Sequence, residues 1–319
     1  MKVPLVSVIV PNYNHAPYLK QRLDSIFNQT FQDFEVIILD DCSTDNSKEI
    51  IEQYRSNPKV SHIIYNETNS GSPFKQWAKG FDLAQGEYIW IAESDDWAEN
   101  VFLEKNTSTL DQDKSLSLVF CGSIIEDGTS EKSNDILSES VKINSYEALS
   151  HFMSMCSLIR NASSVLFKAD LAKQVTKDFT SFKSSGDYFF WVCLLENGDL
   201  YYNNLRLNHY RIHNHNTSIK KRLSGQSFIE DLRIHSYLKS KGYQTFFQTQ
   251  MITLAYLSKI YEELEANPHG KMLLEARKLW RQEIFSANLS KLIVKIGPIV
   301  WKLWQKIHNQ PFFKKQEND

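Results

Sequence analysis

The stretch Gly86-Glu-Tyr-Ile-Trp-Ile-Ala-Glu-Ser-Asp-Asp-Trp97 decides the fold of this chain. Its short apolar run at residues 88–92 follows a glycine turn signal and predicts a buried strand. Three carboxylates, Glu93, Asp95 and Asp96, stand directly after that strand. Crowded acids repel one another and lose hydration, and a divalent cation that prefers oxygen ligands removes the conflict. We therefore expect a metal site here; a solvated acidic turn that caps the next helix is the alternative.

Strand and helix patterns alternate on both sides of this stretch. Amphipathic helical segments separate the first four apolar runs, and this alternation predicts a parallel, doubly wound α/β sheet. Three of those four runs end in polar, turn-prone residues. We expect these residues to meet at the carboxyl edge of the sheet, where open α/β folds bind ligands. The predicted strands are residues 6–10, 34–39, 60–65, 88–92, 116–121, 163–167, 200–202 and 205–210.

The middle of the chain departs from this alternation. Residues 122–145 are polar and acidic, and they predict a surface hairpin or a lid. Residues 146–155 predict a helix. Asp187 stands where a further helix would begin, ahead of an aromatic run that we expect to pack in the core.

After Gly225 only helical patterns remain, so we expect a catalytic domain over residues 1–220 and a helical C-terminal region over 221–319. Residues 284–313 contain no acid, and lysines recur at helical intervals beside an apolar stripe. This pattern is typical of a helix that lies on an anionic membrane surface. We expect the basic amphipathic tail, residues 284–315, to contact a membrane. Packing on the catalytic domain or on the second subunit of a homodimer is the alternative.

Composition sets the broad class of the protein. The chain has 319 residues, 42% hydrophobic and 23% charged, which is enough for one large core with an appendage. A net charge of -2 gives no attraction to nucleic acid. The four cysteines are scattered without metal-site spacing, as free thiols in a reducing compartment would be. The sequence shows neither a signal peptide nor a membrane-length apolar run. We expect a cytoplasmic protein, peripheral on the inner face of the membrane if its tail binds there.

Four motifs occur in order along the chain and resemble the family 2 glycosyltransferases, which have the GT-A fold. The resemblance covers roughly residues 3–218. It implies an inverting enzyme of polysaccharide biosynthesis that moves a sugar from a nucleotide diphosphate sugar, with UDP favoured, to a hydroxyl of a glycan or lipid-linked saccharide. It also implies a nucleotide-sugar-binding half at 1–121 and an acceptor-binding half at 122–220. The motifs are Val6-Ser-Val-Ile-Val-Pro-Asn-Tyr-Asn14, Leu39-Asp-Asp-Cys-Ser-Thr-Asp45, the stretch 86–97, and Gly186-Asp187 with Tyr210-Arg-Ile-His213.

The resemblance implies roles for individual residues around the donor. Asp187 matches the catalytic base, and Asp41 matches the acid that hydrogen-bonds the uracil ring. Lys75 and Arg211 are candidates to face the phosphates. The residues expected beside the nucleotide are Pro11, Asn12, Tyr13, Asn14 and Ser94.

The acidic stretch supplies the implied site for Mg²⁺ or Mn²⁺. Asp95 matches the direct ligand, Glu93 stands where the family more often has an aspartate, and Asp96 is the frequent third acid. His213 matches a loop histidine that closes over the diphosphate and metal in some relatives. Such an ion would neutralise the departing diphosphate while Asp187 takes the proton of the attacking hydroxyl.

Three positions depart from the family pattern: Cys42 replaces a common glycine, Glu93 an aspartate, and Gly186 a glutamate. These departures motivate the alternative of a catalytically degenerate sugar-nucleotide-binding protein. A nucleotidyltransferase on a similar sheet is the enzymatic alternative, whereas no G-x-G-x-x-G follows the first strand, as a dehydrogenase would require. For single residues, the alternatives are a helix cap at Asp187 and a solvated loop at His213.

Overall fold

The computed structural model describes residues 3–127, 131–133, 135–213 and 224–284. The chain groups into two compact units, the first within Met1–Ala148 and Ser157–Asn214 and the second within Leu149–Cys156 and His215–Asp319. The predicted tail at 284–315 lies outside the described residues, apart from its first residue. The expected domain boundary at residue 220 and the roles of the two halves remain predictions.

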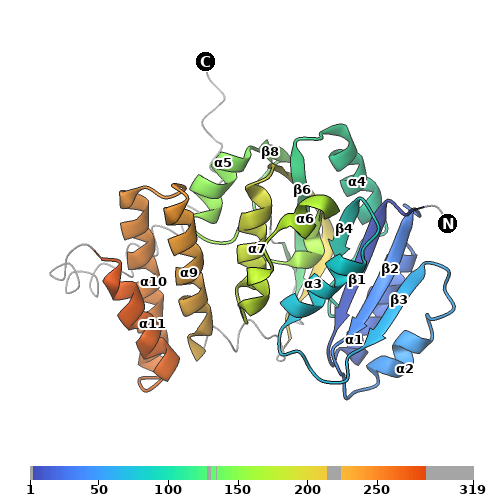
Figure 1. The fold of residues 1–319 in the computed structure, drawn as a ribbon, viewed down its shortest axis with the longest axis horizontal. Coiled ribbons are helices and arrows are strands. Elements are labelled where there is room, and N and C mark those ends of the chain that lie inside the picture. Colours follow the sequence, from blue (N-terminus) through green and yellow to red (C-terminus); the bar gives the residue numbers. More distant parts are fainter. Residues whose placement is uncertain (1–2, 128–130, 134, 214–223, 285–319) are drawn as a thin grey trace. The chain divides into compact units, whose positions relative to one another are not determined.

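The first unit is built on a ten-stranded sheet in the order β3-β2-β1-β4-β9-β6-β10-β5, with β7 beside β6 and β8 beside β10. The first four strands in this order run parallel, and Figure 1 shows β1, β2 and β3 side by side. They are the predicted strands, and every residue of β1, β2 and β4 is buried because helices cover both faces of the sheet. Their bounds are β1 (Val6–Asn12), β2 (Phe34–Asp40), β3 (Val60–Tyr65) and β4 (Tyr88–Ile91).

Beyond β4 the sheet becomes mixed. Strand β9 (Val165–Lys168) lies antiparallel between β4 and β6 (Leu116–Glu126). Residues 200–202 and 205–210, predicted as two short strands, belong to one strand, β10 (Asp199–Arg211), whose pairing with β6 shifts register within this segment. The α/β class and the parallel first half are confirmed, and the antiparallel insertion is a feature that alternation of strands and helices could not predict.

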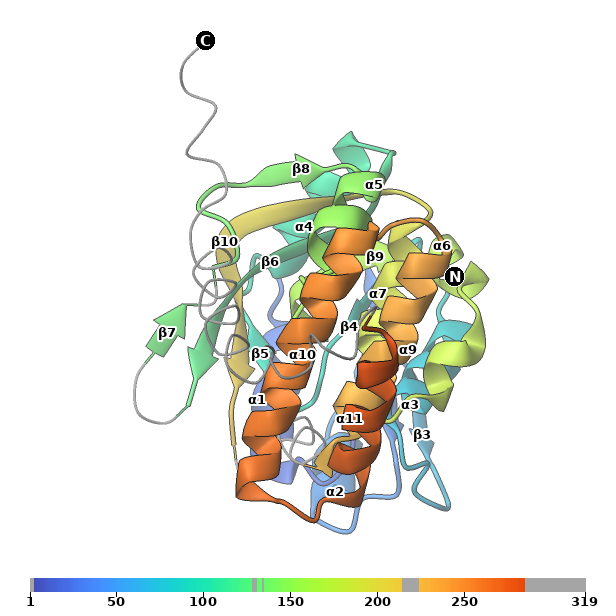
Figure 2. The same ribbon diagram turned by 90° about the vertical axis from the view of Figure 1, so that its left-hand side faces the viewer.

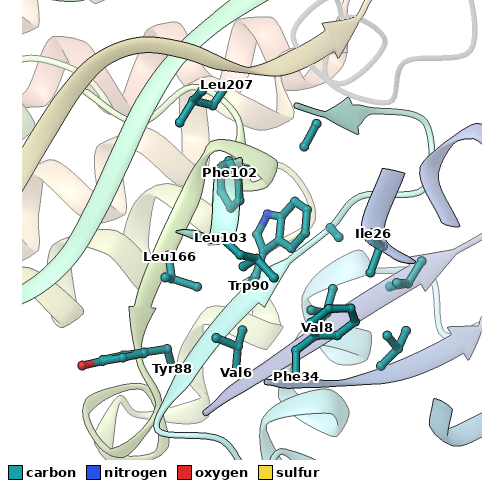
Figure 3. Close-up of a cluster of buried hydrophobic side chains, with 14 of the residues drawn as sticks. Val6, Val8, Ile26, Phe34, Tyr88, Trp90, Phe102, Leu103, Leu166 and Leu207 are labelled. Atoms are coloured by element: carbon teal, nitrogen blue, oxygen red, sulfur yellow. The ribbon is translucent and has the colours of Figure 1, made fainter. Parts of the chain in front are cut away.

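Helices cover both faces of the parallel half. Val6, Val8 and Val10 point to one face, where they join the buried side chains of α1 (Ala16–Phe27) and α4 (Phe102–Gln112) in a single core cluster. In Figure 3, Trp90 lies against Phe102, and their rings stack with centroids 4.4 Å apart. Helix α4 was not predicted from the sequence.

The opposite face carries α3 (Pro73–Leu83) and α7 (Gly186–Leu195). Phe190 of α7 is fully buried and packs its ring against Trp77 and Phe81 of α3, at centroid distances of 6.0 and 5.3 Å. The aromatic run after Asp187 is therefore core, as expected. The remaining elements of this unit are α2 (Ser47–Glu52), β5 (Trp97–Ala98), β7 (Glu131–Ser133), β8 (Val141–Ile143), α5 (Ser145–Glu147), α6 (Ala169–Gln174) and two 3₁₀ turns (Ala162–Ser164, Lys177–Ser181).

The pairing of β6 with β7 is antiparallel, which agrees with the hairpin interpretation of residues 122–145. The predicted helix at 146–155 is instead the short α5 followed by a π-helix at Ala148–Met153. Residues Leu149–Cys156 belong to the second unit, a grouping that the sequence did not indicate.

The second unit consists of helices, as predicted. Figure 2 shows the three helices α9 (Gln226–Ser240), α10 (Phe246–Ala266) and α11 (Lys271–Gln282). Their buried side chains form a small apolar core that includes Phe228, Ile260 and Trp280. A capping box between Thr245 and Gln248 begins α10. None of the helices in the described part of the chain is long and apolar enough to cross a bilayer.

Candidate active site

The candidate site lies where β1, β2 and β4 end. Because these strands are parallel neighbours, the residues that follow them meet at the carboxyl edge of the sheet, as predicted. The end of β10 reaches the same edge, since the backbone amide of Arg211 donates to Asp96 Oδ1 at 3.1 Å.

Three side chains at this edge form a group that could hold a metal ion. His15, Asp95 and His213 each offer one ligand atom, and these atoms all lie within 4.8 Å of one another. His213 Nε2 is 3.1 Å from Asp95 Oδ2, and His15 Nδ1 is 2.8 Å from Ser94 Oγ. Burial alone would raise the pKa of Asp95, but the hydrogen bond from His213 and the charges of both histidines lower it below its ordinary value.

Aromatic and cationic contacts hold the two imidazoles in place. The Tyr18 ring stacks on His213, with centroids 5.1 Å apart, and also lies edge-on to His15 at 6.3 Å. The Arg211 guanidinium lies 4.7 Å from the centroid of the same tyrosine ring, and its Nη1 donates to the carbonyl oxygen of Asp95 at 2.6 Å. Arg211 therefore ties the end of β10 to the acidic turn.

Asp96, predicted as a metal ligand, lies outside this group. Its side chain is buried, and Oδ2 accepts hydrogen bonds from Asn161 Nδ2 at 2.9 Å and Ser163 Oγ at 2.7 Å. Burial raises the pKa of Asp96 to about 6. These contacts hold the acidic turn on the segment before β9, and metal ligation by Asp96 remains a prediction.

Glu93 also lies outside the group. Its Oε1 accepts from Trp77 Nε1 at 2.9 Å, and its backbone amide donates to Ser163 Oγ at 3.1 Å. Burial, followed by the charge of Asp95, raises the pKa of Glu93 to about 8. The extra methylene of glutamate thus reaches a tryptophan of α3, and ligation by Glu93 remains a prediction.

A buried arginine beneath the acids was missed by the sequence analysis. Arg22 of α1 is fully buried, donates from Nε to the carbonyl oxygen of Glu93 at 2.8 Å, and places Nη2 3.9 Å from Asp96 Oδ2. Desolvation lowers the pKa of Arg22 to about 10, although the nearby acids act in the opposite direction. On the sequence alone this residue looks like part of the polar face of an amphipathic helix.

The segment expected beside the nucleotide is a rigid loop. Asn12 donates from Nδ2 to Asp40 Oδ2 at 2.8 Å, and the Asn14 amide donates to Ser43 Oγ at 2.9 Å. Pro11 is buried in β1, whereas the side chain of Tyr13 is 45% exposed at the rim and available to a ligand.

Asp41, expected to bind the base, is engaged by the chain itself. Its Oδ1 accepts from Asn66 Nδ2 at 2.6 Å and from Gln76 Nε2 at 2.7 Å, while Oδ2 accepts from Ser70 Oγ at 2.8 Å. Lys75 is exposed and donates from Nζ to the carbonyl oxygen of Ser70 at 2.9 Å. A base contact by Asp41 would require part of this network to exchange its partners.

Asp187 lies in the first turn of α7, partly buried, and its Oδ1 accepts from the amide of Tyr188 at 2.8 Å. The phenol of Tyr210, on β10, is affected by the charges of both Asp187 and the acidic turn. Desolvation raises the pKa of the Tyr210 phenol to about 12, and the charges of Asp96, Asp95 and Asp187 add to the shift. The charges of Asp187 and Asp95 therefore both act on the Tyr210 phenol.

His15 is the functional candidate that the sequence analysis did not name. Its one signal in the sequence is its position directly after Asn14, in the loop that leaves the first strand. Its partners are distant in sequence, since Ser94 lies 79 residues away.

The open α/β sheet with acids and imidazoles at its carboxyl edge is the arrangement that the resemblance to GT-A glycosyltransferases predicts. The chain belongs to glycosyl transferase family 2, whose family model matches residues 7–166. This finding decides against the nucleotidyltransferase alternative.

Similar proteins support the same assignment. The chain is 30% identical over 221 residues to TuaG of Bacillus subtilis, a glycosyltransferase named for teichuronic acid biosynthesis, and the match covers 68% of this chain and 83% of TuaG. It is 40% identical over 110 residues to the poly(ribitol-phosphate) beta-N-acetylglucosaminyltransferase TarS of Staphylococcus aureus, which is 33% of this chain and 19% of TarS.

Solved structures confirm the fold. The crystal structure of TarS residues 1–349 in complex with UDP-GlcNAc aligns with 96% of this chain and 89% of that chain at a TM-score of 0.65 and 20% identity. The mannosyltransferase PcManGT from Pyrobaculum calidifontis, in complex with GDP-Man and Mn²⁺, aligns with 99% of this chain and 89% of that chain at a TM-score of 0.55 and 16% identity.

Proposed function

We propose that this chain is an inverting glycosyltransferase that moves a sugar from a UDP-sugar to a hydroxyl of a glycan or lipid-linked saccharide during synthesis of a cell-envelope polymer. The observation that carries the proposal is the convergence of His15, Asp95 and His213 at the carboxyl edge of the sheet. The nucleotide follows from TarS, which was solved with UDP-GlcNAc, and the acceptor class follows from the names of TarS and TuaG.

In this proposal Asp187 acts as the general base. Its carboxylate accepts the proton of the acceptor hydroxyl while the hydroxyl oxygen attacks the anomeric carbon and the bond to the nucleoside diphosphate breaks. A single displacement of this kind inverts the configuration at the anomeric carbon, as in inverting glycoside hydrolysis. The hydrogen bond that Asp187 Oδ1 accepts from the amide of Tyr188 holds the carboxylate at the start of α7.

The chain's own residues fit a divalent cation. One carboxylate and two imidazoles converge, and Asp95 Oδ2 lies 3.1 Å from His213 Nε2. When bound, Mg²⁺ or Mn²⁺ would neutralise the charge that gathers on the leaving diphosphate. Arg211 holds the acidic turn in position, and Lys75 and Ser94 are expected at the phosphates and at the rim of the nucleotide site.

Replacing Asp187 by Asn tests the proposal. Loss of the base should lower kcat by about 10²–10⁴-fold because general-base catalysis contributes that much. Binding of UDP should stay within about twofold, since the carboxamide is isosteric with the carboxylate. The measurements are release of UDP from a panel of UDP-sugars with glycan acceptors, and calorimetric titration with UDP.

The matched control is Asp178→Asn, an exposed aspartate of the 3₁₀ turn before α7, for which neither quantity should change. Full turnover by the Asp187 variant would show that the base is another residue. A wild-type chain that binds UDP but turns over no nucleotide sugar would be the degenerate binding protein.

A further inference from the structure

We propose that His15 is a third protein ligand of the metal, and that the resulting site of two imidazoles and one carboxylate selects Mn²⁺ and similar transition ions over Mg²⁺. The inference rests on the proposed function, which requires an ion beside Asp95. It goes further by naming an additional ligand and the class of ion.

The positions of the ligand atoms fit one ion with little adjustment. Two ligands of an ion at about 2.1 Å lie at most about 4.2 Å apart. The three candidate atoms lie within 4.8 Å of one another, and the pair His213 Nε2 and Asp95 Oδ2 is already at 3.1 Å. Side-chain rotations that move the ligand atoms by about half an ångström would therefore bring all three within bonding distance of one ion.

Ser94 orients the His15 ring for this role. The Ser94 side chain is 1% exposed, and its hydroxyl lies 2.8 Å from His15 Nδ1. An imidazole whose Nδ1–H donates to a fixed oxygen presents the lone pair of Nε2 to a metal, an arrangement that metal-binding histidines usually have. Ser94 thus takes the place of the usual carboxylate or carbonyl behind the ligand.

Formation of the first turn of α1 does not require a histidine side chain at position 15. The carbonyl oxygen of His15 accepts from the amides of Tyr18 and Leu19 at 2.9 and 3.0 Å, which any residue could do. The His15 side chain makes no capping hydrogen bond to this helix. The imidazole is instead directed toward Ser94 and the ring of His213, whose centroid is 5.7 Å away.

The ligand set decides the class of ion. Mg²⁺ prefers oxygen ligands and retains several waters, whereas imidazole suits first-row transition ions. Glu93 and Asp96 bond to other groups, so Asp95 is the single carboxylate oxygen donor in the described group. One oxygen and two nitrogen donors favour Mn²⁺, Fe²⁺, Co²⁺ or Zn²⁺ over Mg²⁺.

The test is a titration of the metal-free full chain with Mn²⁺ in the absence of nucleotide. The electron paramagnetic resonance signal of free Mn²⁺ measures how much of the ion is bound. Three protein ligands should hold Mn²⁺ in the wild type. His15→Gln should weaken Mn²⁺ binding by at least about tenfold, and Ser94→Ala, which keeps the ligand but not its support, by about tenfold. His62→Gln on the edge strand β3 is the control and should bind like the wild type.

A second readout counts the ligands directly. Electron spin-echo modulation of bound Mn²⁺ should show two imidazole nitrogens in the wild type and in His62→Gln, and one in His15→Gln. In competition, the preference for Mn²⁺ over Mg²⁺ should fall at least about tenfold in His15→Gln.

The outcomes separate this inference from the proposed function. Unchanged Mn²⁺ affinity and two nitrogens in His15→Gln, or binding by the wild type only after UDP is added, would overturn the role of His15. If Asp95→Asn loses Mn²⁺ while His15→Gln keeps it, the metal site and the proposed function stand without His15. If Asp95→Asn binds as tightly as the wild type, the metal part of the proposed function fails as well.

Discussion

Cys42 is held in a left-handed backbone conformation, with φ at +64°, directly after the paired acids Asp40 and Asp41. Asn14 on the neighbouring loop has φ at +57°, which asparagine tolerates better than other non-glycine residues. The common glycine that Cys42 replaces is therefore explained by backbone conformation. We therefore expect the replacement of glycine by Cys42 to affect the stability of the fold rather than ligand binding.

Cys42→Gly should stabilise the fold. A non-glycine residue in this conformation costs about 1–2 kcal/mol, and glycine costs about 0.5–1 kcal/mol through the entropy of the unfolded chain. We expect a net gain of up to about 1 kcal/mol in the free energy of unfolding, measured by urea denaturation. Cys42→Ala is the control, since it removes the thiol but keeps the strain. Equal stability of the two variants would show that the left-handed backbone is not strained.

At the scale of elements, α7 is fitted so closely against α3 that its first residue must be glycine. A Cβ on Gly186 would lie 2.5 Å from Phe74 Cδ2 and 2.7 Å from the carbonyl oxygen of Phe179. This close approach gives a physical reason why the glutamate of the family pattern is missing here. The helix can approach α3 only without a side chain at this position, and Asp187 follows it into the site.

Gly186→Ala should destabilise the protein by about 1–3 kcal/mol because overpacking forces neighbouring groups to shift. The sign of the stability change distinguishes the two cases, because a glycine-to-alanine change without steric obstruction in a helix stabilises the protein by about 0.5–1 kcal/mol. Thermal unfolding measures the difference, and Gly186→Ala should cost less in a Phe74→Ala background than in the wild type, because one of the two close contacts is then removed. A higher melting temperature for Gly186→Ala would contradict the close packing of α7 on α3.

At the scale of the whole molecule, unfolding should depend on pH through a histidine of the second unit. His235 of α9 is buried, and its Nδ1 accepts from Gln244 Nε2 at 2.9 Å. Desolvation lowers the pKa of His235 to about 3. The unfolded chain binds a proton near pH 6.5, so between about pH 6.5 and 3 the unfolded state holds more protons than the folded state.

The stability contributed by neutral His235 is therefore complete above about pH 6.5 and is lost as the pH falls. The full pKa difference corresponds to on the order of 5 kcal/mol. His235→Gln should be less stable than the wild type at pH 7, and the gap should narrow as the pH falls to 4. Melting temperatures across this range measure the gap, with His62→Gln as the control. A constant gap would show that His235 does not resist protonation.

The extent to which the site was predictable differs from residue to residue. Asp95 and His213 were identified in the sequence because they belong to motifs, and the structure brings their side chains to 3.1 Å. Asp96 was placed with them because it is adjacent in sequence, yet its carboxylate turns inward to Asn161 and Ser163. The direction of an acidic side chain in a tight turn depends on its hydrogen-bond partners, which here lie some 65 residues away in the sequence. The spacing of the acids within the motif carries no information about these partners.

The sequence by itself determined the alternating strands and helices, the buried parallel half of the sheet and the edge at which the polar residues meet. Periodicity suffices there because a strand buried on both faces can be read from its own residues. Only the tertiary structure decided the antiparallel position of β9, the burial of Arg22 beneath the acids and the approach of His15 to Asp95. Each of these depends on contacts between segments far apart in the chain, and such contacts are selected by packing rather than by local pattern.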